Sequence, residues 1–213
     1  MAAPKDRYLS READSLALRW PENAIMNIVC HGHSVPAGYA CTPLVRPLAA
    51  YPHKLRCLLA ERYPYAVVNV IVSAIGGENS VQGARRIEKD VLAHTPRIVT
   101  IDYGLNDRAI GLKAAEKAWR LMIEKALGMD VKVILMTPSW DTSKDISPLL
   151  QHTEMIRHLA DEYDVGLADI FLAWKRSMDQ GEALNNLLSH INHPSERGHE
   201  LIASELAAWF PPR

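Results

Sequence analysis

Residues 26–34 read Met-Asn-Ile-Val-Cys-His-Gly-His-Ser, an apolar run that ends in a Gly-x-Ser turn. Similar short runs, rich in Val and Ile, lie at about 67–73, 97–102 and 131–136, and a weaker run lies at 165–170. Runs of this length and composition are typical of strands that are buried on both faces of a parallel sheet. Each run therefore predicts one strand.

Apolar residues at helical spacing separate these runs along the chain. They are Leu55, Leu58 and Leu59; Val81, Ala84, Ile87 and Val91; Ala115, Trp119, Met122, Ile123 and Ala126; Ile156, Ala160 and Tyr163; and Ile202, Leu206 and Trp209. Gly128 is placed to end the third of these helices, and Ser195 is placed to cap the last one. Strands that alternate with helices predict an α/β fold, with a parallel sheet covered on both faces and right-handed crossovers.

Four short motifs stand where the predicted strands or loops end. Ser34 follows the first strand, Gly76-Gly77 the second and Gly104-Leu105-Asn106-Asp107 the third, whereas His193-Pro194 precedes the last helix. Because the carboxyl ends of parallel strands gather reactive groups at one edge of a sheet, we expect the four motifs to meet there.

The residue types in these motifs fit acyl transfer. The hydroxyl of Ser34 is a weak nucleophile until a base removes its proton, and histidine has a suitable pKa near neutrality, which favours His193. A tetrahedral oxygen that gains charge needs donors already in place. The backbone N–H groups of Ser34 and Gly77 and the side-chain amide of Asn106 can supply them. Ser34 and His193 are therefore the predicted catalytic residues.

Each motif also has an ordinary structural interpretation. Gly-x-Ser and Gly-Gly occur in turns, and Asn-Asp can form a turn or cap a helix. The functional interpretation depends on the fixed order of four motifs at four junctions.

The order and spacing of the motifs resemble those of the SGNH hydrolases, the GDSL esterase/lipase superfamily, from about residue 26 onward. The four blocks of that superfamily are matched by Gly32–Tyr39, Ile75–Gly77, Gly104–Asp107 and His190–Pro194. The resemblance implies a three-layer α/β/α, flavodoxin-like parallel sheet of about five strands. It also implies the serine, histidine and oxyanion-hole roles given above.

Two positions depart from the family pattern. His33 stands where the family has an aspartate beside the nucleophile, and His190 stands three positions before His193, where the family has the acid that orients the histidine. Loss of such an acid in a serine protease costs about four orders of magnitude in turnover. We expect a backbone carbonyl or a carboxylate from elsewhere to hold His193. The candidate carboxylates are Glu78, Asp107, Asp141 and Glu196.

Two loops are expected to shape substrate preference. Residues 35–50 lack a clear period and contain three prolines, and residues 137–143 follow the fourth strand at the same edge as Ser34. Trp140 and Tyr39 are candidates for substrate binding, although an aromatic residue in a loop is as often a packing anchor. Because the chain has no added lid domain, we expect an open cleft that suits short acyl groups.

Histidines near the proposed site raise a different chemistry. The chain has 9 histidines, and five of them flank the site as zinc ligands would: His31, His33, His190, His193 and His199. The sequence has no His-Glu-x-x-His motif, and two of the five already belong to the family blocks. We therefore expect no metal and no cofactor.

The composition is that of a soluble enzyme with one domain. With 213 residues and a formal net charge of -1, the chain gives no electrostatic reason to expect nucleic acid or an anionic membrane as partner. Residues 1–25 carry charges throughout, so we expect no signal-peptide core in them. We expect these residues to form a lead-in segment that packs on the domain at 26–213 or against a second subunit. The three cysteines lack metal spacing and favour reduced thiols in a cytoplasmic protein.

Three functions remain open from the sequence. The first is a serine esterase that hydrolyses a carboxylic ester of a short acyl group, such as acetyl on a sugar or another small molecule, through an acyl-enzyme on Ser34. The second is an acyltransferase that uses the same site, and the third is a non-catalytic binding protein derived from the fold. The expected partner is a small-molecule ester, and self-association stays open.

Overall fold

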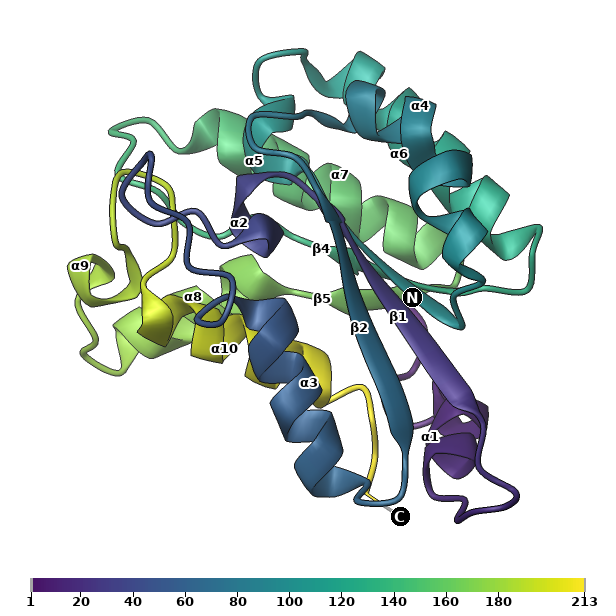
Figure 1. Ribbon diagram of the computed structural model, residues 1–213. Coiled ribbons are helices and arrows are strands. Elements are labelled where there is room, and N and C mark those ends of the chain that lie inside the picture. Colours follow the sequence, from purple (N-terminus) through teal and green to yellow (C-terminus); the bar gives the residue numbers. More distant parts are fainter. Residues whose placement is uncertain (1, 213) are drawn as a thin grey trace.

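The computed structural model, which describes residues 2–212, contains a five-stranded sheet (Figure 1). Its strands are β1 (Ile25–Gly32), β2 (Val67–Ala74), β3 (Ile98–Asp102), β4 (Lys132–Met136) and β5 (Gly166–Ala168). They lie in the order β2-β1-β3-β4-β5, and each neighbouring pair is parallel. The predicted α/β fold with a parallel sheet is confirmed.

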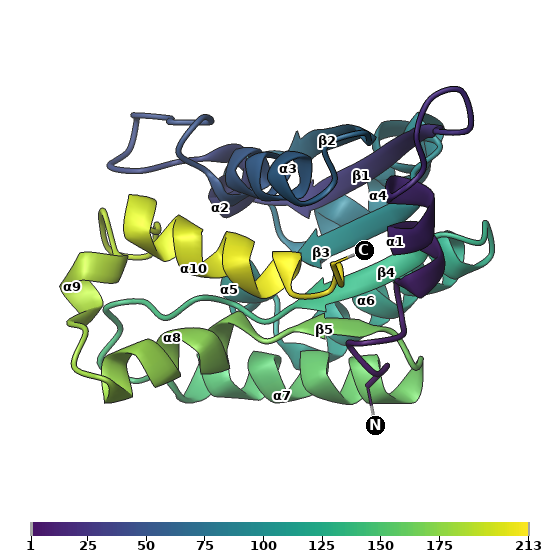
Figure 2. The ribbon, with the colours of Figure 1, turned by 90° about the horizontal axis from the view of Figure 1, so that it is seen from below.

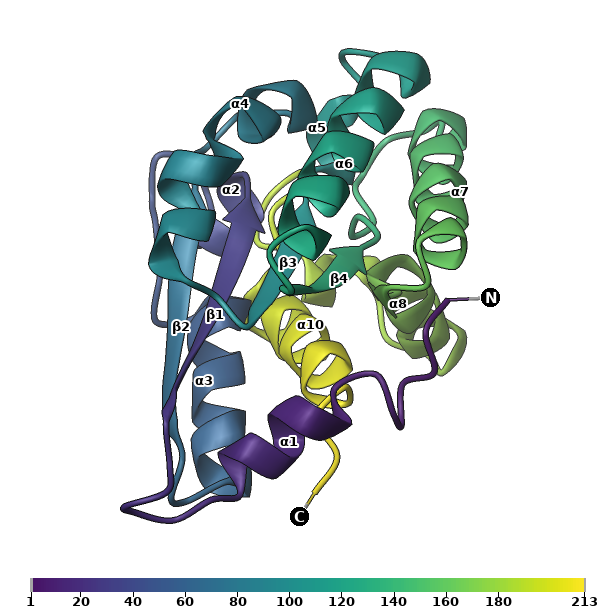
Figure 3. The same cartoon turned by 90° about the vertical axis from the view of Figure 1, so that its right-hand side faces the viewer.

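Helices cover both faces of the sheet (Figure 3). One layer consists of α4 (Ser80–Asp90), α6 (Leu112–Leu127) and α7 (Ser147–Glu162). The other consists of α3 (Tyr51–Arg62), α8 (Ile170–Asp179) and α10 (Glu196–Ala207), which lie side by side in Figure 2. The shorter elements are α1 (Ser10–Leu16), α2 (Ser34–Ala37), α5 (Gly104–Asp107), α9 (Leu184–Leu187) and a 3-10 turn, η1 (Leu92–His94).

Successive side chains along the strands point to opposite faces and so divide the core into two layers. Ile28 and Ile98 belong to the cluster that contains residues of α3, α8 and α10, whereas their neighbours Val29 and Val99 pack with residues of α4, α6 and α7. All four side chains are fully buried. Burial of one such side chain stabilises the fold by about 1.5–3 kcal/mol.

The edge strand β2 differs from the prediction of strands buried on both faces. β2 lies at the edge of the sheet, and its residues Val67 and Val72 are 44% and 46% exposed. β5 ends at Ala168 because the carboxylate of Asp169 accepts the Leu172 N–H at 3.1 Å and caps α8. A capping side chain at this position ends the strand and begins the helix.

The expected helix ends are found near Gly128 and Ser195. The Ser195 hydroxyl accepts the Gly198 N–H at 3.2 Å and caps α10. Gly128 follows α6, but with a right-handed φ of -61°, and the left-handed residue of this turn is Asp130, with a φ of 57°.

The lead-in segment packs against the domain. Leu9, Ala13 and Leu16 are buried in the same cluster as Ala207 and Trp209. In Figure 2, α1 lies at the end of the sheet opposite to α2. These contacts attach α1 to the domain. Within residues 2–212, no helix is both long and apolar enough to cross a membrane.

Candidate active site

The turn after β1 places Ser34 at the carboxyl edge of the sheet. β1 ends at Gly32, and Ser34 is the first residue of α2, where its side chain is nearly buried. A Cβ atom on Gly32 would lie 2.6 Å from the Asp102 carbonyl oxygen and 2.8 Å from Pro36 Cγ. Only glycine therefore fits this turn, because any side chain would push β3 or α2 away from β1.

His193 lies directly beside the serine. Its Nε2 is 3.0 Å from Ser34 Oγ, and its Nδ1 is 2.8 Å from the backbone carbonyl oxygen of Ala40. A carbonyl can only accept, so Nδ1 carries the proton and Nε2 presents a lone pair to the serine hydroxyl. This is the tautomer that a general base for Ser34 needs. The two residues are 159 positions apart in the chain, and the fold brings them into contact.

The orienting group of His193 is thus a backbone carbonyl, one of the two alternatives left by the sequence. Within residues 2–212, the four candidate carboxylates have other hydrogen-bond or ion-pair partners. Glu78 pairs with Arg86, Asp107 accepts from Ser80 N and Trp119 Nε1, Asp141 pairs with Arg108, and Glu196 pairs with Lys54. A carbonyl fixes the tautomer but cannot stabilise an imidazolium as strongly as a carboxylate does.

Burial lowers the pKa of His193 below its usual value of 6.5. The hydrogen bond to the Ala40 carbonyl acts in the opposite direction, and the neighbouring His33 and His190 lower the pKa further when they are charged. The imidazole is therefore neutral near pH 7, the state in which it can take a proton from Ser34.

The predicted oxyanion donors lie in the cleft that Ser34 and His193 line. Gly77 has a φ of 81°, which favours glycine, and it lines the same cleft as Ser34. The Asn106 side-chain amide donates to the Glu78 carbonyl oxygen at 2.8 Å. An amide nitrogen carries two N–H groups, and one is enough for Glu78, so the other can face an oxyanion.

An ion pair that the sequence analysis missed supports this turn. Arg86 Nη2 lies 2.7 Å from Glu78 Oε2 and 3.3 Å from the Gly32 carbonyl oxygen, so one guanidinium joins the end of β1 to the turn after β2. Both side chains are 12% exposed. Arg86 is not one of the apolar residues that marked α4, and no motif pointed to it.

The cleft around Ser34 and His193 has a volume of about 310 Å³. Its lining, as far as residues 2–212 show it, contains no Asp, Glu, Lys or Arg: Ser34, Tyr39, Thr42, Gly76, Gly77, Asn106, Asn192 and His193. The ring of Tyr39 is tilted by 40° against that of His193, with the ring centres 5.9 Å apart. The structure thus brings Ser34, His193, Gly77, Asn106 and Tyr39 into one cleft with neutral polar walls.

Comparison with known proteins identifies the family of this chain. Residues 30–201 match the model of the GDSL-like lipase/acylhydrolase family. The chain belongs to this family. It is a carboxylic-ester hydrolase, and the SGNH resemblance is confirmed. The sequence matches none of the curated proteins.

Solved structures with a similar fold include Axe2, an acetylxylan esterase from Geobacillus stearothermophilus. It is 21% identical, with a TM-score of 0.76 over 88% of this chain and 97% of that one. Another is LAE5, an alpha/beta hydrolase enzyme from the metagenome of Lake Arreo in Spain, at 20% identity. Its TM-score is 0.73 over 87% of this chain and 94% of that one.

Trp140 has a packing role in this esterase. Its ring stacks on Phe171 with the centres 4.5 Å apart, and its Nε1–H donates to the Phe171 carbonyl oxygen at 3.0 Å. It is not among the residues that line the cleft around Ser34. Of the two sequence interpretations of Trp140, the contacts show the packing anchor.

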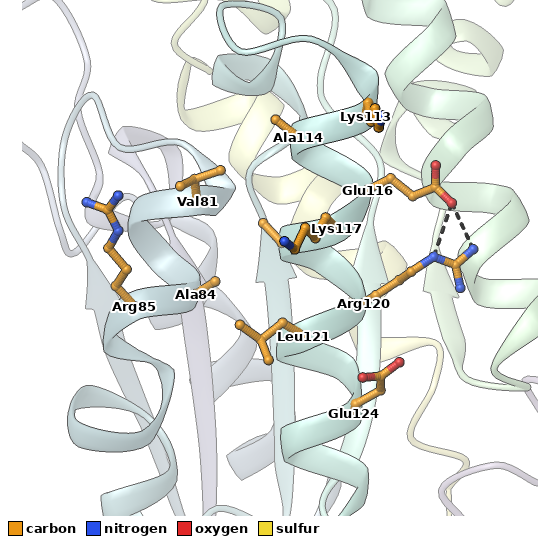
Figure 4. Close-up of a pocket in the computed structure, with 11 residues that line it drawn as sticks. Val81, Ala84, Arg85, Lys113, Ala114, Glu116, Lys117, Arg120, Leu121 and Glu124 are labelled. Carbon is orange, nitrogen blue, oxygen red and sulfur yellow. Dashed lines mark hydrogen bonds and ion pairs between the residues drawn. The ribbon is translucent and has the colours of Figure 1, made fainter.

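A larger surface groove of the esterase lies away from Ser34. It has a volume of about 750 Å³ and runs between α4 and α6, with Ala84 and Leu121 pointing into it and Arg85 and Lys117 at its sides (Figure 4). The family motifs contribute no residue to this groove, whereas they supply most of the lining of the smaller, polar cleft.

Two of the other histidines near the site, His31 and His199, bond to backbone groups. His31 contacts the carbonyl oxygens of Ser73 and Gly83 at 3.2 Å, and His199 Nδ1 accepts the Tyr51 N–H at the same distance. In the part of the chain that the structure describes, no group of three or more His, Cys, Asp or Glu side chains could hold a metal ion. Cys30, Cys41 and Cys57 are free thiols.

Proposed function

We propose that this esterase hydrolyses a short-chain carboxylic ester through an acyl-enzyme on Ser34, with His193 as the base. The observation that carries the proposal is the 3.0 Å contact between Ser34 Oγ and His193 Nε2, in the tautomer that the Ala40 carbonyl fixes. A nucleophile within hydrogen-bond reach of an oriented base is the arrangement that covalent acyl transfer needs.

The reaction follows from the positions of these groups. As Ser34 Oγ bonds to the ester carbonyl carbon, its proton moves to His193 Nε2, and the carbonyl oxygen gains negative charge. The N–H groups of Ser34, Gly77 and Asn106 stabilise that charge, and His193 then gives its proton to the departing alcohol. Water, activated by the same histidine, attacks the acyl-enzyme and releases the acid.

The walls of the cleft favour a small, neutral substrate. With no charged side chain in its described lining, the cleft offers nothing to neutralise an ionic substrate, whereas Asn, Thr and Tyr side chains can hydrogen-bond to hydroxyl groups. A Cβ on Gly76 would lie 2.8 Å from Tyr39 Cζ, so Tyr39 closes the space next to the oxyanion turn and restricts acyl length. Because Axe2 is an acetylxylan esterase, an acetyl group on a sugar is the substrate class that we propose first.

The test is the release of acid from two sets of esters by the wild-type protein and by Ser34→Ala. We expect the wild type to hydrolyse p-nitrophenyl acetate faster than p-nitrophenyl octanoate. We also expect it to release acetate from acetylated xylo-oligosaccharides. Ser34→Ala should catalyse neither reaction. Equal rates with both acyl lengths would contradict the short-acyl proposal. Inactivity of the wild type on every ester would favour the non-catalytic binding protein.

The acyltransferase alternative uses the same acyl-enzyme and differs in its acceptor. Adding a sugar alcohol to the reaction separates the two, because a hydrolase releases free acetate in constant proportion to p-nitrophenol. A transferase instead forms acetylated alcohol at the expense of acetate. We expect acetate to predominate. If most of the acetyl groups were found on the added alcohol, the proposed function would be that of an acyltransferase.

A further inference from the structure

A second histidine also contacts the nucleophile. His33 Nδ1 lies 3.3 Å from Ser34 Oγ, and the His33 ring is fully buried and does not line the cleft. The same Nδ1 accepts the Val35 N–H at 3.3 Å, which shows that Nδ1 presents a lone pair and that the proton of the neutral ring is on Nε2. His33 is thus poised as an acceptor toward Ser34.

A carboxylate lies behind this histidine. His33 Nε2 is 3.5 Å from Asp102 Oδ1, and the Asp102 side chain is 6% exposed. Nε2 has no hydrogen-bond partner within residues 2–212, so Asp102 is the charged group that it faces. The sheet fixes this pair, because Asp102 ends β3 opposite to Gly32 in the register of β1 and β3.

Carboxylate, imidazole and serine hydroxyl therefore stand in sequence on the buried side of Ser34. On the cleft side, the group behind His193 is the uncharged Ala40 carbonyl. The family's acid is missing three residues before His193, and in this chain the Asp102 carboxylate lies behind His33 instead. A buried carboxylate stabilises an imidazolium more strongly than a carbonyl does.

We propose that His33, supported by Asp102, is a second base for Ser34 and can take the hydroxyl proton when the acyl-enzyme forms. This inference rests on the proposed function of Ser34 as nucleophile. Ser34 Oγ bonds to the ester carbon while its proton moves to His33 Nδ1, and the resulting imidazolium faces the Asp102 carboxylate. The long hydrogen bond from Val35 N–H is lost in this step.

Burial limits His33 to that one step. An alkoxide leaving group needs a proton, and deacylation needs a base that activates water. Both events take place in the cleft, which is lined by His193 and not by His33. p-Nitrophenolate, in contrast, departs as an anion without a proton. The two bases can therefore be separated by the leaving group and by the stage of the reaction.

The experiment measures the first turnover of p-nitrophenyl acetate in the His193→Ala variant by stopped flow. We expect a burst of about one p-nitrophenolate per enzyme, followed by an acetyl-enzyme that is visible in the intact mass and hardly turns over. The same variant should not be acylated by ethyl acetate. The burst should be absent in the double variant with Ser34→Ala.

His33→Asn in the His193→Ala background should slow the burst by about a hundredfold, the typical contribution of a general base. Asparagine keeps an oxygen acceptor for the Val35 N–H, so the cap of α2 is preserved. Asp102→Asn should slow the burst by about tenfold or more. His190→Ala, which removes an exposed histidine near the site, is the matched control and should leave the burst unchanged.

Absence of a burst in His193→Ala, in a protein whose wild type hydrolyses the ester, would overturn the inference. A burst that His33→Asn does not slow would also overturn it. If His33→Asn fails to fold, as thermal unfolding would show, Asp102→Asn decides by the same criterion. A wild type that neither hydrolyses esters nor acylates Ser34 would instead contradict the proposed function.

Discussion

Replacing Asn106 by alanine tests the oxyanion hole. In the structure, the Asn106 amide donates to the Glu78 carbonyl oxygen at 2.8 Å and lines the cleft with Ser34 and Gly77. The variant removes two donors at once, one that acts on the transition state and one that holds the turn after β2. The two losses should appear in different measurements.

The first loss should appear in turnover. Removal of one oxyanion donor costs about 2.7–4 kcal/mol of transition-state stabilisation, which lowers kcat by about a hundredfold to a thousandfold. KM should change little, because the charge on the oxygen develops only in the transition state. The second loss leaves the Glu78 carbonyl without this donor and should lower the free energy of unfolding by about 0.5–1.5 kcal/mol.

Steady-state kinetics with p-nitrophenyl acetate and chemical denaturation measure both effects. Asn69→Ala is the matched control, because this exposed asparagine lies in the first half of the edge strand β2 and donates to Asn27 Oδ1 at 3.0 Å, whereas Gly77 follows the other end of that strand. It should leave kcat unchanged. A large rise in KM at unchanged kcat for Asn106→Ala would make Asn106 a ground-state binding residue and refute its oxyanion role.

The remaining predictions concern the histidines. His193→Ala should reduce steady-state turnover by on the order of a millionfold while the protein stays folded, as circular dichroism would show; a loss below a thousandfold would contradict its role. His190→Ala should cost less than tenfold in kcat. Because burial lowers the pKa of His193 below 6.5 and the neutral form is the base, kcat/KM should be constant at neutral pH and fall as the pH drops through a value below 6.5; an apparent pKa above 7 would refute this. Burial also lowers the pKa of His31 to about 4 and that of His199 to about 3. At pH values between these pKa values and 6.5, the unfolded chain binds more protons than the folded protein does. The free energy of unfolding should therefore fall as the pH falls, by about 1.4 kcal/mol per pH unit for each histidine. A free energy of unfolding that does not change over this pH range would contradict the prediction.

The sheet and most helices could be predicted because their patterns are local. The strands at 26–31 and 67–73 were expected within one residue of β1 and β2, since apolar runs of that length have few other interpretations. Exposure of β2 could not be predicted in the same way. Whether a strand lies at the edge depends on the order of strands in the sheet, and the same Val-rich sequence fits either position.

The contact between Ser34 and His193 could be anticipated from sequence because each residue follows a strand or precedes a helix at a recognisable motif. The orienting group could not, because it is a backbone atom: any residue at position 40 would supply the same carbonyl oxygen that His193 contacts. Trp140 shows the converse case. Its identity favours stacking on a ligand or on a neighbouring ring, and the position of Phe171 decides between them.

The pair His33 and Asp102 lay outside the sequence prediction for a related reason. The sequence shows His33 as a departure from the family block, and it shows Asp102 only as the last residue of a strand. Their proximity follows from the register of β1 with β3, in which Gly32 lies opposite to Asp102. Register is set by packing across the whole sheet, and no short motif records it.

Covalent labelling of the nucleophile tests the central claim most directly. After incubation with a fluorophosphonate, the wild-type protein should gain one phosphonyl group, and peptide mapping should place it on Ser34. Ser34→Ala should gain none, and labelling of the wild type should be slower at pH values below the pKa of His193, where that base is protonated. A label on another residue, or equal labelling of Ser34→Ala, would contradict the assignment of Ser34 as the nucleophile.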